Sequence, residues 1–527
     1  MKKIFSILFV FFILVFSVRG NYGNPDINDL SQNEWMKNGP FELSPERGRF
    51  ALTYTITENR NLYFPVNLAE FVLPDLTYRN GNYVSLFAPG VSFIVIPGYL
   101  IGKILNIAQV GTYFIISIFA LSNFILIYSI AKKLGASEVS GILSALIFIF
   151  ATPSFSYATT LYQHHITTFL LLFCLYLQFR FKSFFSHFIT WILIASSFIV
   201  DYPNILLTFP LGVYSLTRII RKRINGSEVK FRIDLRKLAA VAAAGIPLTL
   251  LLMYNRAAFN SPYQLSVAIP AVKSINDDGS PLFYGQSLNE DSFVRPSTNY
   301  FFKTRSIING LYVHIVSPER GMVFFAPVVL LGTAGVSVLY KKKQGKTALL
   351  VSIAAINIVM YSMWEDPWGG WAFGSRYLIP TYAVLSLFLS LAIDYFGRRN
   401  IFRLVFLFLL NYSLFVNILG GLTTSAIPPK AEAQALSNLF GQEQKYSIDK
   451  NWNYLTQKGS KSFVYNQLFS KILSPQQYFV FIFILTSGFM GCLSLSALKM
   501  INYYFPFPQG KNENFRNINF TALFRNQ

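Results

Sequence analysis

The chain has 527 residues, of which 53% are hydrophobic and only 13% charged, and its formal net charge is +21. Soluble domains carry about 25% charged residues, so this chain has too few polar side chains to cover a soluble globule of its size. Its two cysteines, Cys174 and Cys492, lie in apolar stretches and predict no disulfide framework. The composition therefore predicts an all-α integral membrane protein.

The apolar stretches, taken in chain order, predict a multi-pass protein of the plasma or inner membrane. We expect about 12 transmembrane helices (11–13), because a span needs roughly 20 mostly apolar residues. The first begins Met-Lys-Lys and has no small-x-small cleavage site before Asn21, which favours an uncleaved signal anchor. The predicted spans are 4–19, 111–131, 138–156, 163–180, 185–200, 203–219, 238–254, 321–340, 347–363, 377–396, 401–420 and 476–498.

The stretch 84–105 is apolar but is interrupted by Pro89-Gly90 and Pro97-Gly98. We interpret it as a re-entrant or interfacial segment on the outer side. With this choice the short connections on the cytoplasmic side carry nearly all the excess basic charge, as the positive-inside rule expects. Both termini are then cytoplasmic, and the charge of +21 reports orientation rather than affinity for nucleic acid.

The long connections all fall on the predicted extracytoplasmic side, at 20–110, 255–320 and 421–475, together with the short loop 364–376. Nearly all acidic residues lie there, so we expect the working face to be extracytoplasmic. The last predicted span, 476–498, is followed by a cytoplasmic tail, 499–527.

The first outer loop contains Ser44-Pro45-Glu46, which is typical of a helix start, with a capping residue, then proline, then an acid. The helix predicted here would lie on the membrane surface and carry Glu46, Arg47 and Arg49 near its beginning. A carboxylate beside guanidinium groups at headgroup level suits a general base next to a phosphate site. The alternative is a solvated helix end with local ion pairs.

An ordered set of short motifs carries a family resemblance over about residues 1–380. Glu46-x-x-Arg49-Phe50 is followed by Phe64-Pro65 and by a segment from Asp75 through Tyr83 to Pro89-Gly90. Later come Tyr254-Asn255, Ser317-Pro-Glu-Arg-Gly321 and the stretch from Trp368 through Arg376 to Pro380. Together these resemble the GT-C membrane glycosyltransferases, in the branch of the aminoarabinose transferase, the protein O-mannosyltransferases and their uncharacterised relatives.

The resemblance implies a GT-C-like transmembrane catalytic module over residues 1–420, with juxtamembrane helices in the large first outer loop. It implies a glycosyltransferase that moves a hexose or pentose from a polyprenyl-phosphate donor, with inversion, to a lipid, glycan or protein acceptor. Glu46 would be the catalytic base. The residues expected to bind substrate or phosphate are Arg47, Arg49, Asp75, Tyr83, His164, Arg320, Trp368 and Arg376.

One feature of the sequence departs from the relatives' pattern, and one acid has no counterpart in it. The second outer acid that the relatives carry after the third span is missing, and that position reads Leu161-Tyr-Gln-His164-His165. Asp201 is a lone acid at the end of a predicted span, which we interpret as a helix-terminus residue.

Cofactor signals are few. His164 and His165 are adjacent and so cannot face the same side of a helix. The resemblance implies that His164 is the better candidate for a site, because it matches a recurring His of the relatives. A divalent metal is the one cofactor left open, with His164 or Glu46 as its ligand. The sequence contains no Walker motif, no Gly-rich dinucleotide fingerprint, no Cys/His zinc spacing and no Asp-x-Asp motif, which favours a lipid-linked donor over a nucleotide sugar.

Other functions remain open at this stage. A transporter or flippase of lipid-linked glycans would also span the membrane many times, although such proteins favour charged residues within spans and two related halves. An envelope glycan ligase or polymerase would share the outer site and its arginines. A non-catalytic scaffold is the third alternative.

Overall fold

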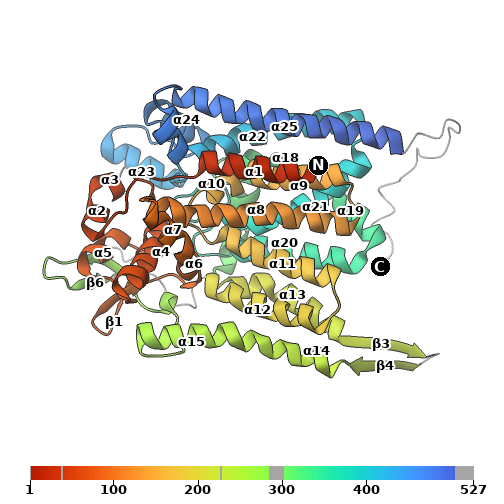
Figure 1. Ribbon diagram of the computed structural model, residues 1–527, viewed down its shortest axis with the longest axis horizontal. Coiled ribbons are helices and arrows are strands. Elements are labelled where there is room, and N and C mark those ends of the chain that lie inside the picture. The colour runs from red at the N-terminus through yellow and green to blue at the C-terminus, as the bar shows by residue number, and fades with distance from the viewer. Residues whose placement is uncertain (1, 37–38, 226–227, 284–301, 505–527) are drawn as a thin grey trace.

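The computed structural model describes residues 2–36, 39–225, 228–283 and 302–504. Most of these residues are helical, and the long helices lie side by side along one direction (Figure 1). One end of this bundle carries most of the short helices and loops (Figure 1, left), and we call it the loop-rich end. The predicted tail beyond 504 and part of the predicted loop 255–320 lie outside the described residues.

Six helices within the described ranges are long and apolar enough to cross a membrane. They are α8 (Ala108–Leu134), α14 to α15 (Leu235–Phe259), α20 (Gln344–Ser362), η6 to α21 (Arg376–Phe396), α22 (Asn400–Leu422) and the first part of α25 (Pro475–Tyr504). Other predicted spans coincide with shorter helices: α1 (Lys2–Ser17), α9 (Glu138–Phe150), α11 (His164–Arg180), α12 (Phe184–Val200) and α13 (Asn204–Ile219). The total of about 12 spans therefore stays a prediction.

One predicted span, 321–340, is divided in the structure. It forms α17 (Met322–Phe325), α18 (Pro327–Leu330) and α19 (Thr333–Lys342) instead of one continuous helix. Pro327 lacks a backbone N–H and restricts the residue before it, which ends α17 at Phe325. Apolar content alone predicts the position of this segment but not its breaks.

The centre of the bundle consists of buried apolar side chains, and its outer surface is also largely apolar. α9 and α21 form the centre, and α8 and α11 pack beside them. On the outside, large apolar side chains remain exposed on helices such as α15 (Gly245–Phe259) and α22, among them Ile246, Leu250, Met253, Ile401 and Phe408. An apolar wall of this kind suits lipid rather than water. Together with the six membrane-length helices, it indicates a membrane protein.

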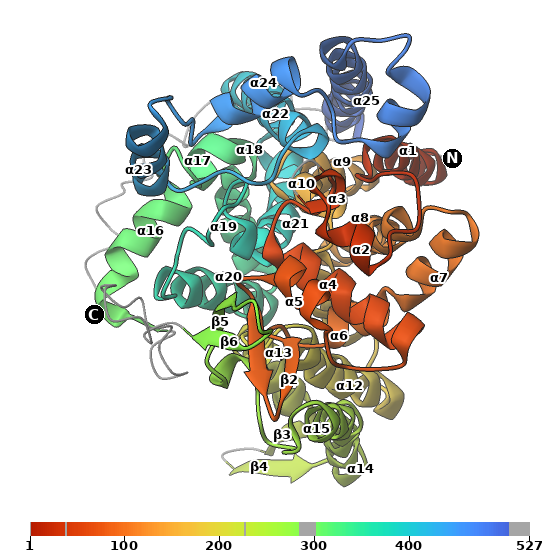
Figure 2. The same ribbon diagram turned by 90° about the vertical axis from the view of Figure 1, so that its left-hand side faces the viewer.

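The first outer loop folds over the loop-rich end. Seen from that end, its other helices lie in front of the bundle, between α16 (Ile307–Ile315) and its last helix, α7 (Ile96–Ile104) (Figure 2). Its elements in chain order are α2 (Ile27–Ser31), α3 (Asn33–Met36), α4 (Ser44–Tyr54), a π-turn η1 (Thr55–Asn59), α5 (Val66–Val72), the hairpin β1 (Leu76–Arg79) and β2 (Asn82–Ser85), α6 (Gly90–Ile94) and α7 (Ile96–Ile104).

The remaining connections contain only short helices and hairpins among the described residues. At the loop-rich end lie α10 (Ser154–Ala158), the hairpin β5 (Val272–Ile275) and β6 (Pro281–Phe283), α16, α23 (Lys430–Phe440), α24 (Ile448–Gln457) and η7 (Tyr465–Phe469). The hairpin β3 (Ile220–Asn225) and β4 (Glu228–Ile233) extends from the opposite end (Figure 1).

The segment 84–105 forms the short helices α6 and α7 rather than one long helix, and α7 packs directly against α8. A Cβ added to Gly111 would lie 2.1 Å from the carbonyl oxygen of Gly98, so the two backbones touch at these glycines. We expect Gly111→Ala to destabilise the protein by about 1–3 kcal/mol, because the backbones must separate. Gly245→Ala is the matched control, since its Cβ would meet no atom within 4 Å. Equal unfolding midpoints for the two variants would contradict this packing.

Candidate active site

The helix α4 begins one residue earlier than its sequence signal suggests. Ser44 is its first residue, and the capping position belongs to Leu43. The carboxylate of Glu46 provides the cap by accepting hydrogen bonds from the backbone N–H groups of Glu42 (3.1 Å) and Leu43 (3.3 Å). Ser44 is thereby free for another contact, and its hydroxyl donates to Asp75 at 2.6 Å.

Glu46 itself is completely buried. Its second oxygen accepts a hydrogen bond from the Tyr113 hydroxyl at 3.2 Å. Burial raises the pKa of Glu46 to about 7, and the nearby charge of Glu42 adds to the rise. A carboxyl group with this pKa is poised for proton transfer near neutral pH, but both of its oxygens are engaged with donors that hold α4 in place.

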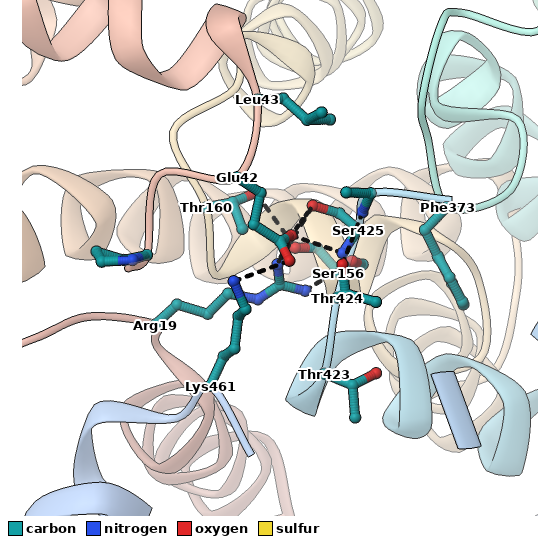
Figure 3. Close-up of polar contacts among 12 residues, drawn as sticks. Arg19, Glu42, Leu43, Ser156, Thr160, Phe373, Thr423, Thr424, Ser425 and Lys461 are labelled. Atoms are coloured by element: carbon teal, nitrogen blue, oxygen red, sulfur yellow. Dashed lines mark hydrogen bonds and ion pairs between the residues drawn. The ribbon is translucent and has the colours of Figure 1, made fainter. Parts of the chain in front are cut away.

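A buried ion cluster centred on Glu42 lies beside this helix (Figure 3). Arg19, just beyond α1, donates to Glu42 at 2.8 Å, and Lys461 approaches the other carboxylate oxygen at 2.9 Å. The backbone N–H and the hydroxyl of Ser425 each donate to Glu42 at 2.7 Å. Burial opposes the ionisation of Glu42, yet the charges of Lys461 and Arg19 outweigh it and hold its pKa well below the usual range.

The Glu42 cluster joins distant parts of the chain. Arg19 also donates to the carbonyl of Gly420 at 2.9 Å, at the end of α22. Further contacts attach the end of α1 to the segment after α24, because the Phe463 N–H donates to the carbonyl of Val18 at 2.9 Å. The cluster therefore fixes the first outer loop on the bundle.

Arg49 projects from α4 to the beginning of α11. Its guanidinium donates to the side chain of Gln163 at 2.7 Å, and the amide of Gln163 donates in turn to Asp201 at 3.0 Å. Asp201 lies in the turn between α12 and α13. Three elements that are far apart in the sequence are thus connected through one row of polar side chains.

Tyr162 is the centre of the site. The guanidinium carbons of Arg49 and Arg376 lie 5.7 Å and 5.2 Å from the centroid of its ring. The ring of His164 stacks on it with centroids 5.8 Å apart. We call Arg49, Tyr162, His164 and Arg376 the Tyr162 cluster.

The Tyr162 cluster contains several buried polar atoms that have no hydrogen-bond partner among the described residues. These are Nε and Nη1 of Arg376, Nε of Arg49, Nε2 of His164 and the hydroxyl of Tyr162. Leaving a buried polar group without a partner costs about 1–3 kcal/mol. Native structures seldom gather several such groups in one place, so this cluster is suited to a polar ligand.

The position of Arg376 is set by a glycine-containing loop. Its Nη2 donates to the carbonyl of Gly369 at 2.6 Å, and Gly369 has a φ of +73°, a conformation that favours glycine. The neighbouring Tyr377 stacks on Tyr361 of α20 with ring centroids 4.3 Å apart, and Trp364 lies against both rings. Aromatic rings therefore line the cluster on the α20 side.

The two adjacent histidines face different surroundings, as helical geometry requires. His164 faces the rings of Tyr162 and Tyr377. His165 points into the bundle, where its Nε2 lies 2.8 Å from the carbonyl oxygen of Ser154. Only His164 belongs to the Tyr162 cluster.

Arg320 is outside this cluster, and its hydrogen bonds go to backbone carbonyls. It donates to the carbonyls of Trp368 (3.1 Å), Glu319 (2.8 Å), Gly370 (3.1 Å) and Ile427 (2.7 Å). It is completely buried. These contacts hold the loop that carries Arg376, while Trp368 contributes its backbone to them.

Three further predicted residues lie in the first outer loop, apart from the Tyr162 cluster. Arg47 donates to the carbonyls of Met36, Phe41 and Glu42 and thereby ties the chain before α4 to that helix. Asp75 receives the bond from Ser44. The hydroxyl of Tyr83 donates to the carbonyl of Gly279 at 2.9 Å, which attaches the β1–β2 hairpin to the β5–β6 hairpin.

The surroundings of His164 do not fit a divalent cation. The positive charges of Arg376 and Arg49 act on it. Glu46, the other ligand considered, is engaged with backbone N–H groups and Tyr113. No group of three or more His, Cys, Asp or Glu side chains that could hold a metal occurs in the described part of the chain.

Several residues of the site escape sequence reasoning. Tyr162 and Gln163 lie within the segment where an acid was expected, and Asp201 was interpreted as a helix-terminus residue. The one available signal was their position at the loop-rich ends of spans, which many other residues share. Arg19, Glu42 and Lys461 offer no local pattern, because Arg19 lies 23 residues from Glu42, and Ser425 and Lys461 lie several hundred residues from both.

No family model matches the chain, and no curated protein sequence matches it significantly. Among solved structures it is similar to ArnT from Cupriavidus metallidurans in the apo state, with 12% identity and a TM-score of 0.44, over 94% of this chain and 77% of ArnT. The same protein bound to undecaprenyl phosphate matches with 11% identity and a TM-score of 0.44, over 95% of this chain and 77% of that chain.

The oligosaccharyltransferase of Archaeoglobus fulgidus, in complex with Zn and sulfate, matches with 11% identity and a TM-score of 0.39. The match covers 84% of this chain and 56% of that one. ArnT, an aminoarabinose transferase, and the oligosaccharyltransferase are both GT-C glycosyltransferases, the superfamily that the sequence motifs resemble.

Proposed function

We propose that the protein is a membrane glycosyltransferase that moves a sugar from a polyprenyl-phosphate-linked donor to a lipid, glycan or protein acceptor. The observation that carries this proposal is the set of unpartnered donors on Arg49 and Arg376, which lie over the same Tyr162 ring. Guanidinium groups with free N–H donors select an anion, and their fork matches the oxygens of phosphate.

The depth of the site supports a donor that is carried by a lipid. Arg376 is the first residue of the apolar segment Arg376–Phe396, which is long enough to cross a membrane. Its guanidinium therefore lies where the apolar layer begins, at the level of lipid phosphates. In the predicted orientation this is the extracytoplasmic face. The rings of Tyr361, Trp364 and Tyr377 would line the space beside the phosphate.

The reaction we propose is a single displacement at C1 of the sugar. The acceptor hydroxyl loses its proton to a carboxylate and its oxygen bonds to C1, while the bond from C1 to the phosphate oxygen breaks. The leaving polyprenyl phosphate gains a negative charge, which Arg49 and Arg376 stabilise. One displacement inverts the configuration at C1. No step is assigned to a metal.

The assignment of the base to Glu46 stays a prediction, and its contacts make Glu46→Gln a clean test. The amide of Gln can accept the bonds from the Glu42 and Leu43 N–H groups, so the helix cap is preserved. At unchanged fold, loss of a general base lowers a rate by roughly 10²–10⁴-fold.

The stability of Glu46→Gln has a defined pH dependence. The folded-state pKa of about 7 lies above the ordinary value of 4.5. The stabilisation by the protonated carboxyl is therefore complete below pH 4.5 and is lost as the pH rises through 7. Because Gln does not ionise, we expect the variant to be more stable than the wild type at pH 8, by on the order of 1–3 kcal/mol, and equally stable at pH 4. Unfolding midpoints at both pH values measure this, and a less stable variant at pH 8 would contradict the burial of Glu46.

Mass spectrometry of envelope lipids, glycans and glycoproteins from a deletion strain tests the proposed function in the native host. We expect one envelope component to lack a single sugar and the polyprenyl-phosphate sugar to accumulate. An unchanged profile of all three classes would refute the proposal. Accumulation of the donor on the cytoplasmic leaflet alone would indicate a flippase instead.

A further inference from the structure

A carboxylate beside the proposed phosphate site requires a physical reason, because it repels the anion that the arginines attract. Asp201 is such a group. Its carboxylate accepts a hydrogen bond from Gln163, whose amide oxygen accepts one from Arg49. Asp201 therefore lies beside the Tyr162 cluster, in the turn after α12, and the charges of Arg49 and Arg376 both act on it. A residue that only terminated a helix would not need to point there.

Asp201 keeps capacity for a further hydrogen bond. Its Oδ2 accepts from Gln163 at 3.0 Å, and the Tyr202 backbone N–H also donates to the carboxylate. A carboxylate can accept about four hydrogen bonds. Asp201 is also less buried than Glu46.

The other carboxylates of this region are less available. Glu42 is occupied by Arg19, Lys461 and Ser425. Glu46 is completely buried, and each of its oxygens already accepts from a backbone N–H group or from Tyr113. A substrate hydroxyl could approach Glu46 only by displacing these donors.

Resting on the proposed function, we infer that Asp201 is the carboxylate that accepts the proton of the acceptor hydroxyl. As the acceptor oxygen bonds to C1 of the sugar, its proton passes to Asp201. The electron pair of the broken C1–oxygen bond leaves on the polyprenyl phosphate, against Arg49 and Arg376. Gln163 holds Asp201 and Arg49 at a fixed separation, so the proton acceptor and the phosphate site keep their relative positions.

The surroundings of Asp201 define the expected pH dependence. Burial raises the pKa of Asp201 above its ordinary value, although the bond from Gln163 and the charges of Arg49 and Arg376 act in the opposite direction. The other ionisable groups that face it, Tyr361 and Tyr377, are phenols that do not titrate in the acid range. The transfer rate should therefore rise with pH on the acid side, as Asp201 loses its proton.

The test compares the full-length chain and its variants in lipid nanodiscs, with membrane lipid extract of the deletion strain as the donor source. We expect Asp201→Asn to lower the rate of sugar transfer by roughly 10²–10⁴-fold and to remove the acid limb of the pH profile. Asp201→Glu should restore part of the rate with a shifted limb. Asp278→Asn removes the same charge from an exposed turn and should behave as the wild type.

Binding of undecaprenyl phosphate separates chemistry from folding. Asp201→Asn should bind this lipid at least as tightly as the wild type, because a negative charge next to the phosphate is removed. If Asp201→Asn is not recovered folded, the pH profile of Asp201→Glu decides, and an unaltered profile overturns the inference.

The possible results separate this inference from the proposed function. A wild-type rate for Asp201→Asn at all pH values overturns the role of Asp201 while the transferase function stands. An acid limb that persists in Asp201→Asn but disappears in Glu46→Gln returns the base to Glu46. Absence of transfer by the wild-type chain refutes the function and the inference together.

Discussion

Arg376→Gln is expected to weaken binding of undecaprenyl phosphate by roughly 10- to 150-fold, because hydrogen bonds to charged groups contribute about 1.5–3 kcal/mol. The transfer rate should fall further, since the charge on the phosphate grows as the sugar leaves. Two nitrogens of Arg376 have no partner within the described structure, so the substitution removes donors that the fold itself does not use there. Titration of the lipid in nanodiscs and initial transfer rates measure both effects.

Two further variants make this experiment specific. Arg376→Lys keeps the positive charge but loses the planar fork, so binding should be intermediate. Arg305→Gln removes an arginine that is exposed in the short helix η5 (Thr304–Ser306), away from the Tyr162 cluster, and should bind as the wild type does. Wild-type affinity in Arg376→Gln would contradict a phosphate site at Tyr162.

Glu42→Gln is expected to destabilise the protein by about 3–5 kcal/mol, the usual effect of breaking a buried ion pair by removing one partner. Arg19 would lose its carboxylate while remaining fully buried, and Lys461 would lose its partner at 2.9 Å. Because the Glu42 cluster fastens the first outer loop, we expect the loss of structure to begin there. Denaturation midpoints and protease cleavage within residues 20–110 measure this.

The more exposed pair of Glu58 and Lys103 provides the matched control. Its side chains are 24% and 46% exposed, so Glu58→Gln should change stability by less than about 1 kcal/mol. If both substitutions have the same small effect, the Glu42 cluster does not hold the loop.

The contribution of Glu42 also has a defined pH dependence. Its folded-state pKa lies well below the ordinary value of 4.5. The stabilisation by Glu42 is therefore complete above pH 4.5 and is lost as the pH falls below that value. The stability of the Glu42→Gln variant should not decrease in this way at acid pH, because Gln does not take up a proton.

Hydrophobicity and short motifs in the sequence predicted the positions of most helices and three residues of the Tyr162 cluster. Arg49, His164 and Arg376 were selected from segments more than 100 residues apart, and the structure brings all three to the ring of Tyr162. Apolar runs located most of the helices. They could not locate the breaks at 326 and 331–332, because those depend on the conformation of individual residues rather than on composition.

The polar partners could not be predicted in the same way. Gln163 matters because its two ends meet Arg49 and Asp201, and that is a property of three packed helices rather than of any one segment. Arg19 marked only the end of a span in the sequence, whereas the structure places it against Glu42, Ser425 and Gly420. Long-range pairing of this kind leaves no periodicity in a single chain.

The most direct measurement of the central claim is the fate of the lipid donor on the purified protein. The full-length chain in nanodiscs is incubated with membrane lipid extract from the deletion strain, and the products are followed by mass spectrometry. We predict that a sugar appears on an acceptor while free polyprenyl phosphate forms in equal amount, and that Arg376→Gln does neither. Donor that is bound but released with its sugar still attached would contradict the account.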